Sequence, residues 1–189
     1  MTTATVTRKT KETDISIKLV PVPGTSEIHT GIGFFDHMLT AFAFHSGITL
    51  NCQVIGDLHV DGHHTVEDTG LALGQAVKEA LEDKLGIERF ASAYIPMDEA
   101  LGFAALDISG RPFLRFDREM TGMIGDYDAC LTKEFFRALT TAAGLTLHLK
   151  AEGENAHHMT EALYKAAGRA FRQAAEITGS GIPSTKGAL

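Results

Sequence analysis

The segment His63-His64-Thr65-Val66-Glu67 returns later in the chain as His157-His158-Met159-Thr160-Glu161. A histidine pair followed three residues later by a glutamate rarely occurs by chance at two matching points of one chain. In both copies an apolar pattern with a period of about 3.6 residues follows, so each segment opens a helix. The duplication therefore predicts a protein built from two similar halves.

The residues before each copy repeat as well. Gly-Ile-Thr-Leu at 47–50 and Gly-Leu-Thr-Leu at 144–147 each lead into an alternating, strand-like run. His37 stands ten residues before Gly47, and Glu134 stands ten residues before Gly144, each inside an apolar helical run. The repeat therefore places Glu134 opposite His37.

These patterns predict the architecture. Two more strands are expected at 13–20 and 100–108, and the two His-His helices should run from 63 to about 85, stopped by Gly86, and from 157 to about 178. Strands grouped with helices predict an α+β fold, in which each half is a β-sheet with two helices packed on one face. We expect a single domain over 1–189, with repeats at 1–92 and 93–180 and a C-terminal segment at 181–189.

Composition excludes several classes of protein. The chain has 189 residues and a formal net charge of −7, which argues against general binding to nucleic acid or to anionic membranes. No stretch reaches the roughly 18 apolar residues of a membrane span, and the first residues lack the apolar core of a secretion signal. The two cysteines, Cys52 and Cys130, provide no disulfide framework. A cytoplasmic protein is expected.

The duplicated motif has the chemistry of a metal site. His63 and Glu67 lie four residues apart on one helical face, where one ion can bind both, while His64 is rotated by about 100° and must point elsewhere, such as toward a second metal. The same holds in the second copy. Imidazole and carboxylate ligands without thiolate suit Mn, Fe, Co, Ni or Zn acting as a Lewis acid. Eight candidate ligands, enough for two ions, are His37, His63, His64, Glu67, Glu134, His157, His158 and Glu161.

Other polar residues carry weaker signals. The remaining histidines, at 29, 45, 59 and 148, are interpreted as ordinary polar residues, and Glu134 alone would equally suit a solvated carboxylate near a helix N-terminus. Basic groups are few. Arg89 and Arg111 flank turns, and Ser184 and Lys186 lie near the C-terminus, a set that can hold a phosphate group.

Together these motifs resemble one family. Phe34-Phe35-Asp36-His37-Met38-Leu39, the two His-His segments, Ser109-Gly110-Arg111-Pro112 and the Pro-Ser-Thr-Lys end occur in the order found in the imidazoleglycerol-phosphate dehydratases of histidine biosynthesis. The resemblance runs from about residue 7 to residue 186. It implies the monofunctional form, a hydro-lyase that converts D-erythro-imidazoleglycerol phosphate to imidazoleacetol phosphate.

The resemblance also implies a site and an assembly. It implies two Mn²⁺ ions per active site, metal ions acting as Lewis acids on the substrate ring, and self-association into a 24-subunit cage with sites at subunit interfaces. The resemblance implies a further histidine ligand in the family, and Glu134 stands at that position in this chain. Either Glu134 binds the metal or a water molecule occupies the coordination position. Glu161 or Glu67 would relay protons, Glu12 and Asp98 would contact the substrate, and the phosphate would lie on Arg89, Arg111, Ser184 and Lys186.

Two other functions fit part of the pattern. A dinuclear phosphate-ester hydrolase would use the same ligands to make a hydroxide nucleophile. A metal-storage or metal-sensing oligomer would take up metal without turnover, and it leaves Arg111 and the Ser184–Lys186 segment unexplained. The products formed from imidazoleglycerol phosphate distinguish these three functions.

Overall fold

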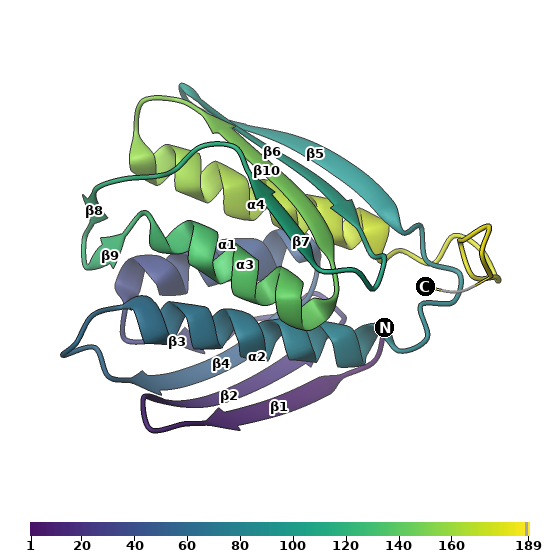
Figure 1. Ribbon diagram of the computed structural model, residues 1–189, viewed down its shortest axis with the longest axis horizontal. Coiled ribbons are helices and arrows are strands. Elements are labelled where there is room, and N and C mark those ends of the chain that lie inside the picture. The colour runs from purple at the N-terminus through teal and green to yellow at the C-terminus, as the bar shows by residue number, and fades with distance from the viewer. Residues whose placement is uncertain (188) are drawn as a thin grey trace.

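In the computed structural model, which describes residues 1–187 and residue 189, two four-stranded sheets form the outer layers. Four helices lie between the sheets, two against each sheet, as Figure 1 shows. Helices α2 and α3 pack closely against each other, and so do α1 and α4. The helices therefore bury one face toward a sheet and another toward a helix of the opposite half.

The two halves have the same order of elements. The first half contains β1 (Ala4–Lys9), β2 (Thr13–Val20), β3 (Glu27–His29), α1 (Gly33–Ser46), β4 (Thr49–Gly56) and α2 (His63–Leu81). The second contains β5 (Phe90–Met97), β6 (Ala100–Asp107), β7 (Phe113–Phe116), α3 (Leu131–Ala143), β10 (Thr146–Glu152) and α4 (Ala156–Ala174), with a small hairpin of β8 (Met123–Ile124) and β9 (Tyr127–Asp128) before α3.

Sheet topology confirms the predicted α+β repeat. The strand orders are β1-β2-β4-β3 and β5-β6-β10-β7, and in each sheet only the last pair is parallel. Alternation sets the buried faces: Ile15, Ile17 and Leu19 of β2 point toward the helices, whereas the residues between them, and Asp14 before them, are exposed. The expected division between residues 92 and 93 falls inside β5, which begins at Phe90.

Two predicted helix ends are wrong. Helix α2 stops at Leu81 rather than near 85, because Glu82 and Lys84 adopt positive φ angles of 50° and 59° that a helix cannot continue through. Helix α4 stops at Ala174 rather than near 178, where the chain turns back and the backbone of Glu176 accepts a hydrogen bond from Glu88. Helices α1 and α3 each end directly before a glycine, Gly47 and Gly144, in the left-handed conformation.

Glycines set the distance between paired helices. A Cβ atom on Gly74 of α2 would lie 2.5 Å from the backbone oxygen of Leu139 in α3, and one on Gly168 of α4 would lie 2.8 Å from the backbone oxygen of Phe42 in α1. Gly74 and Gly168 both stand eleven residues after the first histidine of their motif, since 74 − 63 and 168 − 157 are equal. The repeat therefore includes the close contact that brings the helices together.

In the described part of the chain, no helix is both long enough and apolar enough to cross a bilayer.

Candidate metal centre

One cluster joins helices α1 and α4. Nε2 of His37 lies 3.4 Å from Oε2 of Glu161, and Nε2 of His157 lies 3.2 Å from the same oxygen. The ligand atoms of the three residues all lie within 4.8 Å of one another. Phe34 packs edge-on against the His157 ring and fixes its orientation. Two imidazoles and a buried carboxylate therefore converge on one point suited to a divalent ion.

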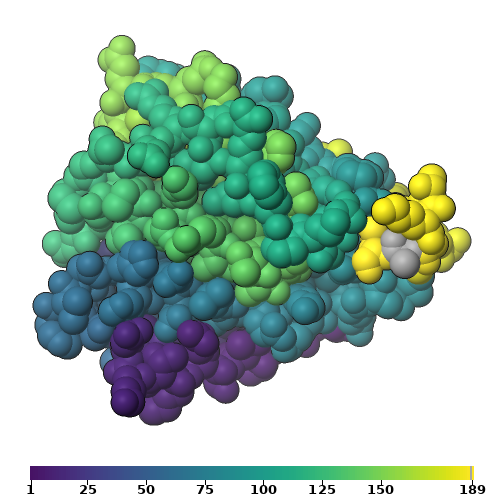
Figure 2. Space-filling model, viewed as in Figure 1, coloured from purple at the N-terminus to yellow at the C-terminus, as the bar shows by residue number. Residues whose placement is uncertain are grey.

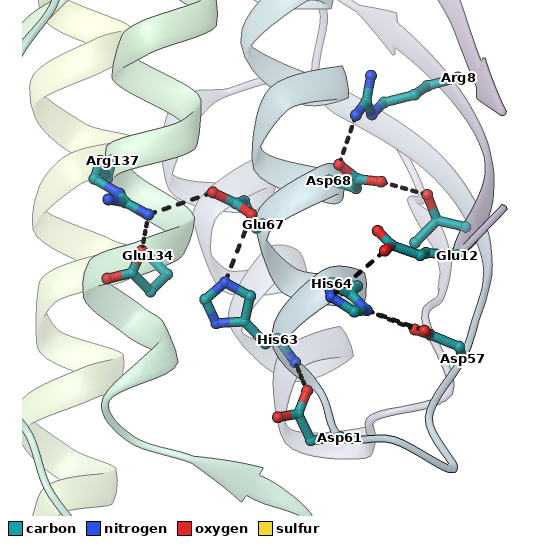
Figure 3. A network of polar contacts seen from close by, with 11 residues as sticks. Arg8, Glu12, Asp57, Asp61, His63, His64, Glu67, Asp68, Glu134 and Arg137 are labelled. Carbon is teal, nitrogen blue, oxygen red and sulfur yellow. Dashed lines mark hydrogen bonds and ion pairs between the residues drawn. The ribbon is translucent and has the colours of Figure 1, made fainter. Parts of the chain in front are cut away.

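A second cluster joins helices α2 and α3. Nε2 of His63 lies 3.5 Å from Oε2 of Glu67, four residues along the same helix, and Glu134 of α3 completes the group. Figure 3 shows His63 and Glu67 on the side of α2 that faces α3, with Glu134 opposite them. This cluster has one imidazole and two carboxylates where the first has two imidazoles and one carboxylate.

The clusters are assembled crosswise between the halves. Each takes two residues from the His-His helix of one half and a third from the preceding helix of the other half, so His37 serves the second motif and Glu134 serves the first. Glu134 thus lies where its repeat partner His37 lies in the other cluster, as the sequence predicts. The sequence alone would not reveal the exchange, because it depends on how the two helix pairs pack.

A basic side chain accompanies each cluster, and the sequence analysis missed both. Nζ of Lys165 lies 2.8 Å from Oε1 of Glu161, and Arg137 pairs with Glu134 and lies 3.3 Å from Oε1 of Glu67. Burial opposes ionisation of Glu161, yet Lys165 and His37 hold the pKa of its carboxyl below the usual value. The spacing of Lys165 four residues after Glu161, and of Arg137 three after Glu134, was the available signal.

The other histidine of each pair points away from the clusters. Figure 3 shows His64 on the far side of α2, where its Nδ1 lies 3.0 Å from Asp57 and its Nε2 lies 3.8 Å from Glu12. In the second copy, Nδ1 of His158 lies 2.7 Å from Glu99 and Nε2 lies 3.8 Å from Asp98.

Neighbouring carboxylates raise the pKa values of both of these rings. The hydrogen bond with Asp57 raises the pKa of His64, and the one with Glu99 raises the pKa of His158. The same bond to His158, together with the backbone amide of Asn155, lowers the pKa of Glu99 to about 2. The expected substrate contacts Glu12 and Asp98 lie in equivalent connections, β1–β2 and β5–β6, each beside the outward-facing histidine of its own half.

The expected phosphate-binding residues gather at the other end of the molecule. Arg89 donates from Nε to Asp107 and from Nη1 to the backbone oxygen of Pro183, which holds the C-terminal segment beside it. Arg111 lies 3.4 Å from the same Asp107 carboxylate. Figure 2 shows this C-terminal segment, in yellow, at one end of the molecule. Ser184 and Lys186 belong to it, and residue 188 of the expected 181–189 segment lies outside the described residues.

The two groups of residues are far apart within one chain. The backbone amide of Arg89 donates to Ala174, the last residue of α4, whereas Glu161 lies near the start of that helix. Thirteen residues of helix at 1.5 Å each separate these positions by about 20 Å. A small substrate cannot reach from a cluster to Arg89 of the same chain.

The fold and its clusters define a class of protein, a duplicated α+β structure with two groups of histidine and carboxylate side chains that could each hold a metal ion. The family model described as Imidazoleglycerol-phosphate dehydratase matches residues 30–171. The chain belongs to this family, the imidazoleglycerol-phosphate dehydratases, which are hydro-lyases of histidine biosynthesis.

Individual relatives agree. The imidazoleglycerol-phosphate dehydratase of Listeria monocytogenes serotype 4b is 53% identical over 194 residues, covering 100% of both chains. The crystal structure of the Staphylococcus aureus dehydratase superposes with a TM-score of 0.84 at 39% identity, covering 94% of this chain and 99% of that one. The corresponding structure from Pyrococcus furiosus gives a TM-score of 0.86 at 39% identity and covers 97% and 100%.

Proposed function

We propose that this chain catalyses the metal-dependent dehydration of D-erythro-imidazoleglycerol phosphate to imidazoleacetol phosphate in the cytoplasm. The observation that carries the proposal is the pair of clusters built crosswise from the repeat, His37 with the second motif and Glu134 with the first. A single accidental grouping of histidine and carboxylate would carry little weight. Two equivalent groupings in a member of this family fit two metal ions per active site.

The donor sets fit divalent transition metals. Each cluster combines imidazole nitrogen with carboxylate oxygen, and the described residues place no thiolate in either, which suits Mn²⁺ and related ions. When bound, such ions would supply Lewis acidity at the imidazole ring of the substrate. His64 and His158, whose Nε2 atoms face away from the clusters of their own chain, would complete metal sites of neighbouring subunits.

The reaction removes one water molecule. The hydroxyl leaves from the carbon attached to the ring, the proton leaves from the next carbon, and the resulting enol becomes the ketone. Glu161 or Glu67 would hold and relay the proton, because each lies at a cluster and has a basic side chain beside it, Lys165 or Arg137. Glu12 and Asp98 would hold the departing hydroxyl from their turns beside His64 and His158.

The phosphate would be held by Arg89, Arg111, Ser184 and Lys186, which orients the reacting carbons. Since Arg89 lies at the end of α4, about 20 Å along the helix from Glu161, a complete site needs the phosphate-binding end of one subunit beside a cluster of another. This separation supports the expected self-association, for which we propose the 24-subunit cage. A monomer of this chain would be inactive.

Product analysis tests the function. Manganese-loaded protein should convert imidazoleglycerol phosphate to imidazoleacetol phosphate without releasing inorganic phosphate. Release of inorganic phosphate with no imidazoleacetol phosphate would support a phosphate-ester hydrolase instead. Tight metal uptake with neither product would support metal storage.

A further inference from the structure

The outward-facing histidines share one feature of hydrogen bonding. Asp57 contacts the His64 ring at Nδ1, with oxygens at 3.0 and 3.2 Å, and Glu99 contacts the His158 ring at Nδ1, at 2.7 Å. The two carboxylates are not equivalent in the repeat. Asp57 directly follows β4, whereas Glu99 lies in the turn between β5 and β6. Two unrelated positions in the sequence therefore make the same contact to the same ring atom.

The chemistry of this contact is defined. An ionised carboxylate only accepts hydrogen bonds, so in the neutral ring it keeps the proton on Nδ1 and leaves the lone pair on Nε2. We propose that Asp57 and Glu99 are positioning residues that fix the tautomer and the ring orientation of His64 and His158, so that each presents Nε2 to a divalent metal ion. The proposal rests on the proposed function in one respect, that these two histidines are metal ligands.

Because Asp57 and Glu99 have different hydrogen-bond partners, replacing each carboxylate by its amide should affect the bound histidine ring differently. Oε1 of Glu99 already accepts the backbone amides of Glu154 and Asn155, and only Oε2 faces His158. In Glu99→Gln the one remaining carbonyl oxygen is held by those amides, so the NH₂ group faces Nδ1. An NH₂ donor requires an unprotonated Nδ1, which places the ring proton on Nε2 and removes the lone pair that would bind metal.

Asp57→Asn should be milder. Both Asp57 oxygens face only the His64 ring among the hydrogen bonds found in residues 1–187 and 189. The asparagine amide can therefore rotate so that its oxygen accepts from Nδ1, and the tautomer is kept. Both substitutions remove one negative charge near a candidate ligand, so a difference between them separates control of the tautomer from an effect of charge.

The test uses the full-length chain labelled with ¹⁵N in its histidine rings. Solid-state NMR of metal-free protein, at a pH above the pKa of both rings, reports which ring nitrogen carries the proton, with His64→Gln and His158→Gln used to assign the signals. Equilibrium dialysis against Mn²⁺ reports the metal bound per chain. Glu154→Gln is the matched control, because it removes an exposed charge in the same loop as the Glu99 contacts.

We expect Nδ1–H tautomers for both rings in the wild type, an Nε2–H tautomer for His158 in Glu99→Gln, and at least a tenfold loss of metal affinity in that variant. Asp57→Asn and Glu154→Gln should keep the Nδ1–H tautomers of both rings and lose less than threefold in metal affinity. The loss expected for Glu99→Gln lies in the range of about 10–100-fold seen when a residue that orients a metal ligand is replaced. An Nε2–H tautomer in the wild type, or equal losses in Glu99→Gln and Glu154→Gln, would overturn the proposal. If the wild type binds no Mn²⁺ but shows the expected tautomers, the hydrogen-bond assignment stands and the metal function fails.

Discussion

Glu134 of α3 occupies in its cluster the position that His37 of α1 occupies in the other. The substitution of a carboxylate for an imidazole changes the charge of the second cluster, and Arg137, one turn further along α3, lies against both Glu134 and Glu67. The two clusters therefore share geometry but differ in ligand set and in the cation that accompanies them.

Replacing Glu134 tests whether it binds metal. Glu134→Ala should reduce manganese occupancy at the second cluster and leave the first cluster filled, because the helix pairs that hold the two clusters are separate. Elemental analysis of dialysed protein measures the ions bound per chain. Glu119→Ala, which removes an exposed carboxylate paired with Lys133 nearby, is the control. Unchanged occupancy in Glu134→Ala would mean that water holds this coordination position.

Arg137 would compete with a metal ion for the carboxylates of Glu134 and Glu67. Arg137→Gln should tighten manganese binding at the second cluster about tenfold, because it removes a positive charge that lies 3.3 Å from Oε1 of Glu67. A titration followed by the electron paramagnetic resonance of free Mn²⁺ measures the change. Arg118→Gln removes an exposed arginine that donates to the backbone of Gly153 and contacts neither Glu134 nor Glu67 among the ion pairs of the described residues, and it should leave the affinity unchanged. Weaker binding in Arg137→Gln would show that the arginine positions the carboxylates instead.

Replacing Glu161 should lower turnover more than replacing any other carboxylate of the two clusters. Glu161→Gln keeps the shape of the side chain but removes the charge that two histidines and Lys165 share, so we expect turnover to fall at least a hundredfold. Steady-state assays of imidazoleacetol phosphate formation, together with metal content, separate lost chemistry from lost metal. Full turnover with full metal content in this variant would remove Glu161 from the mechanism.

The close helix contact at Gly74 predicts an effect on stability. Gly74→Ala places a methyl group 2.5 Å from the Leu139 backbone oxygen, so α2 and α3 must separate. Overpacking of this kind costs about 1–3 kcal/mol of unfolding free energy. Denaturant titration measures it, with Gly33→Ala, which meets no atom within 4 Å, as the matched control. An equal change in both variants would show that helix spacing does not depend on the glycine.

Replacing Asp107 should weaken substrate binding. It pairs with both Arg89 and Arg111, so Asp107→Asn should let the two guanidinium groups move and should raise KM for imidazoleglycerol phosphate several-fold with a smaller change in kcat. Asp117→Asn, which removes an ion pair with Arg115 instead, is the control. A fall in kcat with KM unchanged would place Asp107 in a role other than holding the phosphate-binding arginines.

Much of the fold followed from the sequence because the repeat is encoded locally. The motif spacing predicted the equivalence of Glu134 and His37, and alternation predicted β2 and β6. The edge strands β1, β3, β5 and β7 were missed, since they bury at most one side chain each and so lack the buried alternation of β2. Helix α2 was predicted to be too long, because an apolar pattern in the sequence does not indicate the positive φ angles at Glu82 and Lys84.

The sequence by itself determined which side chains are candidates for chemistry, because a ligand pair four residues apart on a helix is fixed by helical geometry. Only the tertiary structure decided how these candidates combine. The pairing of α1 with α4 and of α2 with α3, made possible by Gly168 and Gly74, assigns His37 to one motif and Glu134 to the other. The length of α4 then separates the clusters from Arg89, because contacts between elements distant in sequence depend on packing that no local pattern records.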